Sequence, residues 1–286
     1  MSNSIAGGSR TTTVSKPRVS VLTFVRNAVN TLPLTIACVD AQTSKDNIEY
    51  IVVDGESTDG TVEVIKSLDS KISKWISEKD RGIVDAQNKA IKLAVGDYVF
   101  CLNADDWVDP DFIEKALQAI GCGEVDIVYG DVVVHAEDGK ELHRLAGSER
   151  FFSTLGSKYQ MPCVNFPTMV IKRSLFDRVG FFDESFKVAP DFEWLLRANK
   201  NIFDIKILYL KGLVTHFRLG GNSDLHYFDG LKEAKRASLL HGGGTFLANC
   251  YMFKRVLMHC FKSIVFKSFP PAVVQHCLNF FRRYLV

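Results

Sequence analysis

The chain has 286 residues, of which 47% are hydrophobic and 24% charged, and its net charge is +2. These values are ordinary for a soluble globular protein, and the length allows one large domain or a domain with an appendage. The polar start of the chain argues against a secretory signal and predicts a cytoplasmic protein. No apolar run reaches the roughly 18–20 residues that a membrane span needs. The cysteines are scattered and form no Cys-x-x-Cys pair, which argues against a metal framework and predicts reduced thiols.

A polar segment rich in Ser, Thr and Gly opens the chain, and residues 1–17 are predicted to be a disordered leader. Two short runs with many β-branched residues follow, at 19–24 and 50–53, and each predicts a strand. The segments after these runs, about 29–43 and 61–68, are predicted to be helical. The body of the protein therefore begins with two strand–helix units.

The alternation of strands and helices continues as far as residue 102. A helix is predicted from near Asp85, and the nearly all-apolar run 98–102 predicts a strand that is buried on both faces. This order predicts an α/β protein with a mostly parallel sheet and helices on both sides. Beyond residue 125 the alternation weakens, and the expected elements are strands at 127–129, 132–134 and 205–210, a hairpin turn at 137–140 and a helix from near Asp191.

Acidic residues follow two of the predicted strands. Asp54 comes after the second strand, and the pair Asp105 and Asp106 comes after the run 98–102. Ligands of open parallel sheets bind beyond the carboxyl ends of the strands. Adjacent carboxylates repel each other, and a divalent cation shared with an anionic substrate relieves that repulsion. A helix N-terminus is the alternative, because Asp109 and Pro110 begin a helix just downstream, and the pair alone leaves both interpretations open.

Six motifs, in order and compatibly spaced, resemble glycosyltransferase family 2 over about residues 18–225. Members of this family share the GT-A fold. The resemblance therefore implies a Rossmann-like sheet and an inverting, hexosyltransferase-type enzyme of polysaccharide, O-antigen or lipopolysaccharide biosynthesis that uses a nucleotide-sugar. The motifs occupy residues 19–27, 53–61, 77–89, 96–106, 180–184 and 191–197.

The resemblance also implies a donor site. The residues that it assigns to the donor nucleotide are Thr23, Asn27, Asp54, Asp80 and Asp85. A carboxylate such as that of Asp54 only accepts hydrogen bonds, which suits the N–H groups of uracil or guanine. An Asx-turn is the alternative role for Asp54, and Asp59 is better explained as the cap of the following helix. Lys89 is left open between a donor contact and a solvated helix lysine.

For the metal, the resemblance implies Asp106 as the direct ligand of Mn²⁺ or Mg²⁺, with Asp105 supporting it or contacting the ribose. Asn103 stands where the family has the first acid of its motif, so the number of protein ligands stays open. The segment 216–223 resembles a family loop that closes near the diphosphate. His216 and Arg218 are the candidate diphosphate contacts in that segment.

An inverting transfer needs a general base that takes the proton of the acceptor hydroxyl. The resemblance assigns this role to Asp191. Pro190 replaces the acid that usually precedes the base, and a proline also suits the first turn of a plain helix. Glu193 is retained as the substitute base, while Trp194 and Arg197 are interpreted as core and salt-bridge residues.

The end of the chain is basic, because no Asp or Glu follows Glu233. Residues 246–286 mix apolar with cationic side chains and contain Pro270 and Pro271. This pattern predicts an amphipathic helix in the interface of an anionic membrane on its cytoplasmic face. The alternative is a helical pair packed on the catalytic domain or on a second subunit, and hence a possible homodimer.

The sequence predicts a GT-A domain over 18–235 and a basic helical appendage over 236–286. The expected partners are a UDP-, GDP- or dTDP-linked donor and a glycan or lipid-linked saccharide acceptor, and no nucleic acid. Two rival functions are considered. A sugar nucleotidyltransferase should have a glycine-rich loop after the first strand, but residues 24–27 contain no glycine. A non-catalytic nucleotide-sugar-binding scaffold would not need the acids Asp106 and Asp191.

Overall fold

The structure is a computed structural model that describes residues 4–11, 18–121, 125–147, 155, 166–201, 204–221 and 225–268. Within these ranges ten strands form a single sheet. The strands are β1 (Ile5–Gly7), β2 (Val19–Val25), β3 (Ile48–Asp54), β4 (Lys74–Ser77), β5 (Tyr98–Cys101), β6 (Trp107–Val108), β7 (Ile127–His135), β8 (Glu141–Leu145), β9 (Val170–Lys172) and β10 (Ile207–Arg218). The helices are α1 (Leu32–Asp40), α2 (Thr61–Ser67), α3 (Ile83–Leu93), α4 (Phe112–Ile120), α6 (Ser174–Val179), α7 (Pro190–Asn201), α9 (Tyr227–Leu240) and α10 (Thr245–Ser268).

The strand order is β1-β4-β3-β2-β5-β9-β7-β10-β6, and β8 pairs with β7. Strands β4, β3, β2 and β5 pair in parallel, and so do β7 and β10. Because β9 is antiparallel to both β5 and β7, these two groups of strands run in the same direction. The carboxyl ends of six strands therefore lie at one edge of the sheet, which confirms the predicted mixed and mostly parallel α/β fold.

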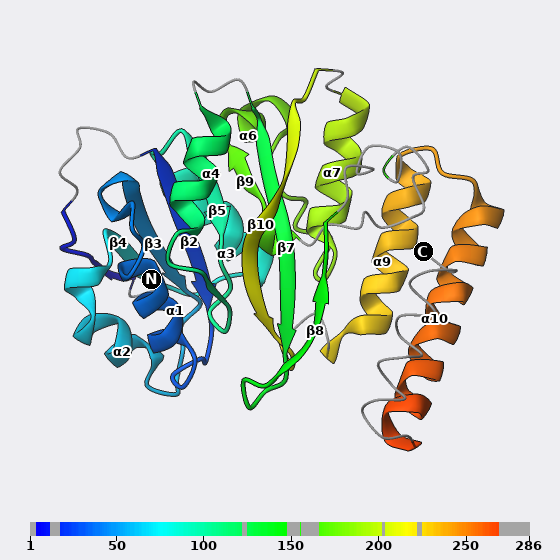
Figure 1. Cartoon of the computed structure of the whole chain (residues 1–286), viewed down its shortest axis with the longest axis horizontal. Helices are drawn as coiled ribbons and strands as arrows, with labels where there is room; N and C mark the ends of the chain where they lie inside the picture. Colours follow the sequence, from blue (N-terminus) through cyan, green and yellow to red (C-terminus); the bar gives the residue numbers. More distant parts are fainter. Residues whose placement is uncertain are drawn as a thin grey trace.

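Helices cover both faces of this sheet (Figure 1). All seven residues of β2 and all seven of β3 are buried, as expected for central parallel strands with helices on both sides. One core cluster joins α3, α6, α7 and α9 to the sheet, with Phe176, Phe192 and Trp194 among its largest members. The other cluster joins α1, α2 and α4 to the opposite face.

The start of the chain contains a strand. Residues 1–17 are predicted to be a disordered leader, but Ile5–Gly7 forms β1, which pairs antiparallel with β4. The indole Nε1 of Trp75 and the amide of Gly8 both donate to Asp69 Oδ1 at 2.7 Å. These bonds hold a polar, exposed segment on the edge of the sheet without a hydrophobic pattern in the sequence. The prediction of a disordered leader also covers residues 1–3 and 12–17, which lie outside the described residues.

The last part of the described chain is a pair of helices, α9 and α10. The predicted domain boundary at 235/236 falls inside α9, whose Ala234 and Ala237 belong to the hydrophobic core. Helix α10 packs on α9, where His259 stacks on the ring of Tyr227 at 4.2 Å, and it lies at the outer side of the molecule (Figure 1). Helix α9 therefore packs into the core on both sides of the predicted boundary. Residues 269–286, with both tail prolines, lie outside the described residues.

Candidate functional site

The predicted site residues gather at the edge of the sheet where the parallel strands end. Asp54 is the last residue of β3, and Arg218 is the last residue of β10. The other predicted positions follow the ends of β2, β4 and β5 within a few residues; they are Asn27, Asp80, Asp105 and Asp106. Three predicted residues are placed differently: Thr23 lies within β2, Asp85 within α3 and Asp191 within α7. The topology thus brings segments that are far apart in sequence to one side of the molecule.

Asp54 organises the loop between β3 and α2. Its carboxylate is fully buried and accepts three hydrogen bonds, from the amide of Ser57 at 3.1 Å, the hydroxyl of Ser57 at 2.5 Å and the hydroxyl of Ser77 at 2.6 Å. These bonds join the loop to the end of β4. The arrangement matches the Asx-turn interpretation, and because the carboxylate is fully buried, a nucleobase would bond to Asp54 only after the loop moved.

Asn27 joins the end of β2 to the same loop. It has a left-handed backbone (φ 55°), its amide donates to Ser57 Oγ at 2.7 Å, and its Oδ1 accepts a bond from the amide of Thr58 at 2.9 Å. A non-glycine residue in this region of φ is uncommon, and such strain clusters at functional sites. The N-cap of α2 is Gly60 and not Asp59 as predicted, but Asp59 still binds the start of the helix, since its Oδ1 accepts the amide of Thr61 at 3.0 Å.

Thr23, in contrast, is a structural residue. Its side chain is fully buried inside the sheet, donates to the carbonyl of Leu102 at 2.9 Å and accepts a bond from the hydroxyl of Tyr50 at 3.2 Å. The prediction that Thr23 contacts the substrate therefore does not match its position, because its side chain is sealed between strands and helices.

The loops after β3 and β4 touch each other at Gly55. A Cβ atom on Gly55 would come within 2.2 Å of Asp80 Oδ2, so only glycine allows this approach. Asp80 is half-buried, and its Oδ1 accepts the amide of Gly82 at 3.0 Å. A Cβ on Gly82 would lie 4.0 Å from the ammonium nitrogen of Lys187. The loop with Asp80 therefore lies beside the segment that leads into α7.

Asp85 and Lys89, at the start of α3, belong to an ion-pair network. Burial alone would raise the pKa of Asp85, but hydrogen bonds from the side chain and backbone of Arg81 and the charge of Lys89 outweigh it and lower the pKa to about 2. Lys89 lies 2.8 Å from a carboxylate oxygen of Glu78 and 3.3 Å from one of Asp85. Lys89 is thus neither a freely solvated lysine nor an unpaired donor contact. The network sets the position of the loop between β4 and α3.

The acidic pair lies in the turn between β5 and β6, where the two carboxylates differ in exposure. Asp106 is fully buried; its Oδ1 accepts the amide of Arg218 at 3.0 Å, and its Oδ2 accepts the side-chain amide of Asn103 at 2.8 Å. Burial and the neighbouring Asp105 raise the pKa of Asp106 well above its usual range. Asp105 is only half-buried, and a Cβ atom on Gly221 would lie 3.2 Å from its Oδ2.

Arg218 lies at the end of β10, next to this pair. Its guanidinium carbon is 5.4 Å from the ring centroid of Trp107, and one terminal nitrogen donates to the carbonyl of Glu137 at 3.4 Å. Its buried Nε has no hydrogen-bond partner among the residues that the structure describes. An unsatisfied buried donor is costly, so a bound anion would stabilise this side chain.

His216 is engaged by protein partners instead. Its Nδ1 lies 2.9 Å from Nε2 of His135, and its Nε2 lies 3.0 Å from Oδ1 of Asp109. The ring of Trp107 stacks parallel to it at 5.2 Å. The predicted loop at 216–223 also begins later than expected, since β10 continues to Arg218. Of the two candidate diphosphate contacts, only Arg218 retains an unused donor.

Asp191 is the second residue of α7 and is partly exposed to solvent. Its Oδ1 accepts the amide of Phe192 at 2.8 Å. Burial against the surrounding protein, together with the nearby negative charge of Glu233, raises the pKa of Asp191 to about 6, although its backbone hydrogen bonds oppose the shift. A carboxylate of this kind is more basic than an ordinary aspartate.

Glu193 has a different environment from Asp191, although both are on the first turn of α7. Its side chain is buried, and it accepts hydrogen bonds from Arg197 at 2.9 and 3.1 Å, while Nε2 of His241 lies 3.1 Å from its Oε1. Arg197 in turn donates to the carbonyls of Val179 and Phe181 at 2.8 Å. Glu193 is therefore a structural residue, and the substitute-base prediction does not match its position.

Comparison with known proteins gives the family of the chain. The model of the family described as glycosyl transferase family 2 matches residues 20–180. The chain belongs to this family. It is 32% identical over 191 residues to the uncharacterized glycosyltransferase Rv1514c of Mycobacterium tuberculosis, covering 64% of this chain and 70% of that protein.

Solved structures show the same GT-A fold. The mannosyltransferase PcManGT from Pyrobaculum calidifontis in complex with GDP-Man and Mn²⁺ is 18% identical, with a TM-score of 0.60 over 97% of this family 2 chain and 84% of its own. TarS 1–349 of S. aureus in complex with UDP-GlcNAc is 17% identical, with a TM-score of 0.59, over 82% and 70% of the two chains. The match covers 42% of full-length TarS.

Some residues that shape this family 2 site carry no signal in the sequence. Ser77 is bonded to Asp54 from the next strand, Lys187 lies beside Gly82, and Glu233 binds the backbone before α7. Each of these residues contacts a partner at least 23 positions away in the sequence, so no local motif reveals the contact. Only the fold brings them to the site.

The described part of this transferase contains no group of three or more His, Cys, Asp or Glu side chains that could hold a metal. A protein-only metal cage is thus absent from these residues. Mg²⁺ and similar ions are often held by one or two carboxylates together with substrate phosphates. The half-buried carboxylate of Asp105 beside the buried Asp106 fits that second mode.

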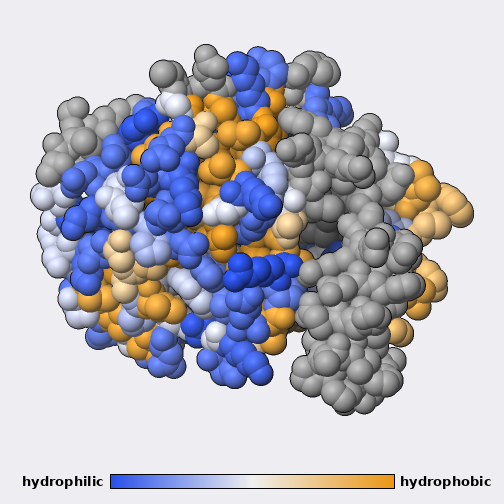
Figure 2. All heavy atoms as spheres, in the orientation of Figure 1, coloured by the Kyte–Doolittle hydropathy of each residue, from blue (hydrophilic) through white to orange (hydrophobic). Residues whose placement is uncertain are grey.

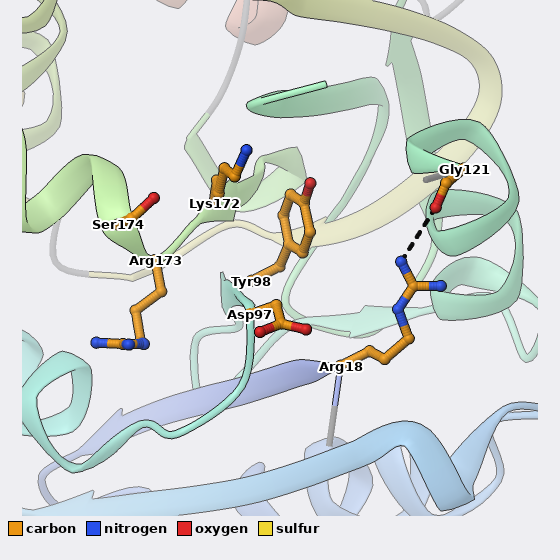
Figure 3. Close-up of a pocket in the computed structure, with 7 residues that line it drawn as sticks. All are labelled: Arg18, Asp97, Tyr98, Gly121, Lys172, Arg173 and Ser174. Carbon is orange, nitrogen blue, oxygen red and sulfur yellow. Dashed lines mark hydrogen bonds between the residues drawn. The ribbon is translucent and has the colours of Figure 1, made fainter. Parts of the chain in front are cut away.

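A pocket of about 580 Å³ lies elsewhere on the transferase. Figure 3 shows that it is lined by residues at the amino ends of β2 and β5, including Arg18 and Tyr98, together with Lys172 at the end of β9 and Arg173 after it. These positions are at the opposite edge of the sheet from Asp54 and Asp106. No predicted site residue lines it, so this pocket lies apart from the candidate site.

Proposed function

We propose that the protein is an inverting glycosyltransferase that transfers a sugar from a nucleotide-sugar donor to a hydroxyl group of a glycan or lipid-linked saccharide. The observation that carries this proposal is the environment of Asp191. Asp191 is a partly exposed residue at the helix start, and burial of its carboxyl group raises the pKa to about 6, so this group is ionised at neutral pH and more basic than an ordinary aspartate. The names of relatives that bind UDP-GlcNAc or GDP-Man support a nucleotide-sugar donor.

The donor would bind across the loops at the carboxyl edge of the sheet. Asn27, Asp54 and Asp80 hold these loops together, and their bonds fix the backbone that would face the nucleoside. Arg218, with its unpartnered Nε, is the candidate for the diphosphate. Stabilising the charge that develops on the leaving diphosphate is the largest contribution that such a site can make.

A divalent cation would be held by Asp105 together with donor phosphates, and Mn²⁺ or Mg²⁺ supplies charge neutralisation at the leaving group when it is bound. Asp106, the ligand that the family resemblance implies, is fully buried in this structure, and each of its carboxylate oxygens accepts one hydrogen bond, from Arg218 and from Asn103. A cation would reach Asp106 only after this turn opened, so we propose Asp105 as the ligand. Asp105 lies at the same turn with more of its surface exposed.

Asp191 would accept the proton of the acceptor hydroxyl as that oxygen attacks the anomeric carbon. General-base catalysis of this kind contributes on the order of 10²–10⁴-fold to the rate. Attack from the face opposite the leaving diphosphate inverts the anomeric configuration. The neighbouring Glu193 does not compete for this proton, because its carboxylate is buried and bonded to Arg197.

Helix α10 would attach the enzyme to an anionic membrane where a lipid-linked acceptor is presented. No helix of the described chain is long and apolar enough to span a bilayer. Helix α10 nevertheless exposes large apolar side chains next to Lys254 and Arg255, and apolar surface is visible at the right edge of Figure 2, where α10 lies. The exposed side chains are Phe246, Leu247, Phe253, Leu257 and Phe261. Co-sedimentation with phosphatidylglycerol vesicles but not with phosphatidylcholine vesicles is the expected result, and equal recovery with both would contradict the proposal.

The decisive experiment is a panel of UDP-, GDP- and dTDP-sugars with saccharide acceptors, assayed with Mn²⁺, with Mg²⁺ and with EDTA. We expect release of nucleoside diphosphate with one donor, its loss in EDTA, and a product whose anomeric proton coupling in NMR shows the opposite configuration to the donor. Turnover in EDTA would refute the metal assignment. Retention of configuration would refute the direct role of Asp191.

A further inference from the structure

The segment before α7 is held from outside its own helix. Glu233, on α9, accepts hydrogen bonds from three consecutive backbone amides: its Oε1 binds Lys187 at 2.7 Å, and its Oε2 binds Val188 at 2.8 Å and Ala189 at 2.9 Å. These amides belong to no strand ladder, and Ala189 is buried. Without this carboxylate the amide of the buried Ala189 would lack an acceptor, because burial removes that residue from water. A charged acceptor also makes stronger bonds than a neutral one.

A second residue of α9 extends this contact. Arg236 donates to the carbonyl of Ser185 at 3.1 Å and to its hydroxyl at 2.6 Å, and its guanidinium lies 4.3 Å from the ring centroid of Phe186. A Cβ atom on Gly230 would lie only 3.1 Å from Val188, so α9 approaches the segment closely. Helix α9 therefore fixes the whole course of residues 185–189.

This segment ends where the proposed base begins. The amide of Glu193 bonds to the carbonyl of Ala189, so the first turn of α7 starts from a residue that Glu233 holds. Asp191 lies in that turn. We propose that Glu233 is a positioning residue for the transfer reaction, and that its carboxylate sets where Asp191 stands relative to the donor loop at Asp80–Gly82.

This inference rests on the proposed function of Asp191 as general base. It adds a residue that acts through another and does not itself contact the substrate. Glu233 also binds the amide of Lys187, whose ammonium lies beside Gly82 in the donor loop. One carboxylate on α9 thus fixes both Lys187, beside the donor loop, and the turn that carries Asp191. A displacement of about 1 Å in such a space can cost roughly 10²-fold in rate.

The negative charge of Glu233 allows a second test, through the pH dependence of the activity. The negative charge of Glu233 faces Asp191 and adds to the effect of burial in raising its pKa. The other charged groups around Asp191 are Lys187 on the preceding segment, which reaches toward Gly82, and Glu193 on α7, which is paired with Arg197. Loss of the charge at position 233 should therefore lower the pKa of Asp191 and move the acid limb of the activity profile to lower pH.

The test compares Glu233→Gln, Glu233→Asp and Asp229→Asn in the full chain, with UDP-GlcNAc and GDP-mannose as donors and nucleoside diphosphate release as the measurement. Glutamine keeps the shape but turns an N–H group toward backbone N–H groups; aspartate keeps the charge but draws the carboxylate back. Asp229 is the matched control, because it lies one turn away on α9 and is paired with Lys232. Thermal unfolding of each variant shows whether it is folded.

We expect Glu233→Gln to reduce kcat by roughly 10²-fold, with an unchanged KM for the donor and an acid limb at lower pH. Glu233→Asp should reduce kcat and leave the acid limb of the pH profile in place. If the glutamine variant does not fold, the aspartate variant alone tests the proposal. Asp229→Asn should behave as wild type. Wild-type kcat in Glu233→Asp, or an equal loss of donor affinity in either variant, would overturn the inference. Retained transfer in Asp191→Asn would instead overturn the proposed function, so the two failures are distinguishable.

Discussion

The backbone amide of Arg218 donates a hydrogen bond of 3.0 Å to Oδ1 of Asp106, a residue 112 positions earlier in the chain. This bond joins the end of β10 to the turn after β5. The hydroxyl of Thr35 in α1 also donates to the carbonyl of Asp106 at 2.8 Å. Asp106 thus connects three elements at the sheet edge, and Asp105 beside it is supported by that frame.

The two acids should therefore respond differently to substitution. Asp106→Ala leaves the amides of Arg218 and Asn103 without their acceptor, and each buried unsatisfied donor costs about 1–3 kcal/mol. Asp105→Ala should leave stability within about 0.5 kcal/mol of wild type but remove the stimulation of donor turnover by Mn²⁺. Urea unfolding and a Mn²⁺ titration of diphosphate release measure the two effects. Metal stimulation retained in Asp105→Ala and lost in a folded Asp106→Ala would restore Asp106 as the ligand.

A second prediction concerns the pH dependence of the reaction. Asp191 must be ionised to accept a proton, and its pKa is raised to about 6, so kcat/KM should fall as the pH decreases through about 6. Asp191→Asn should lose on the order of 10²–10⁴-fold in transfer and keep its affinity for the donor, since the amide oxygen still accepts the bond from Phe192. Calorimetric titration with UDP or GDP checks donor binding. An acid limb near pH 4 would show that a different group carries the proton.

The same carboxyl should lower the stability of the protein at neutral pH. Its folded pKa of about 6 lies above the ordinary value of 3.8, so the folded state holds a proton that the unfolded state has released. The free energy of unfolding therefore falls as the pH rises from about 4 to 6. The difference between the two pKa values sets an upper limit of roughly 3 kcal/mol for this loss, and partial hydration of the residue makes the loss smaller. Asp191→Asn should be more stable than wild type above pH 6, and equal to it near pH 4.

Asp183 provides a control of opposite sign. Burial would raise its pKa, but hydrogen bonds from the amide and side chain of Ser185 and the charges of Arg236 and Arg197 lower it. Asp183 therefore contributes stability above its unfolded pKa, and that contribution is lost as the pH falls. Asp183→Asn should be less stable than wild type at pH 7. A difference between Asp191→Asn and wild type that does not change with pH would contradict the assignment of this effect to Asp191.

The fold was predictable because its main signals are local. The runs that become β2, β3 and β5 are short and apolar, and each is followed or preceded by a helix at the spacing of parallel units. Strand β10 was only half predicted, because Gly212 interrupts its pattern. In the structure Gly212 has a φ of 83°, and a register shift between Tyr209 and Val214 lets the strand continue to Arg218.

The positions of the candidate site residues were predictable where an acid marks the end of a strand, as at Asp54 and Asp106, and where a family motif marks the proposed base, Asp191. Burial of each side chain was not predictable. Seven consecutive buried residues in β2 give no alternation from which the position of Thr23 could be deduced, and adjacent acids do not show which of them turns inward. Partners such as Glu233 are invisible before folding, because they act across more than forty positions.

The last prediction concerns the contact between the loops after β3 and β4. A methyl group on Gly55 would lie 2.2 Å from Asp80 Oδ2, so Gly55→Ala must push the two loops apart or turn the Asp80 side chain away from the amide of Gly82. Either movement disturbs the proposed nucleotide site, while the core strands stay buried. We expect the donor KM to rise by roughly 10-fold or more, corresponding to at least about 1.4 kcal/mol, with little change in thermal stability. Gly244→Ala is the matched control, because a Cβ there meets no atom within 4 Å and its φ is not left-handed. If both variants had the wild-type KM for UDP- and GDP-sugars, the close approach of these loops would not form part of the donor site.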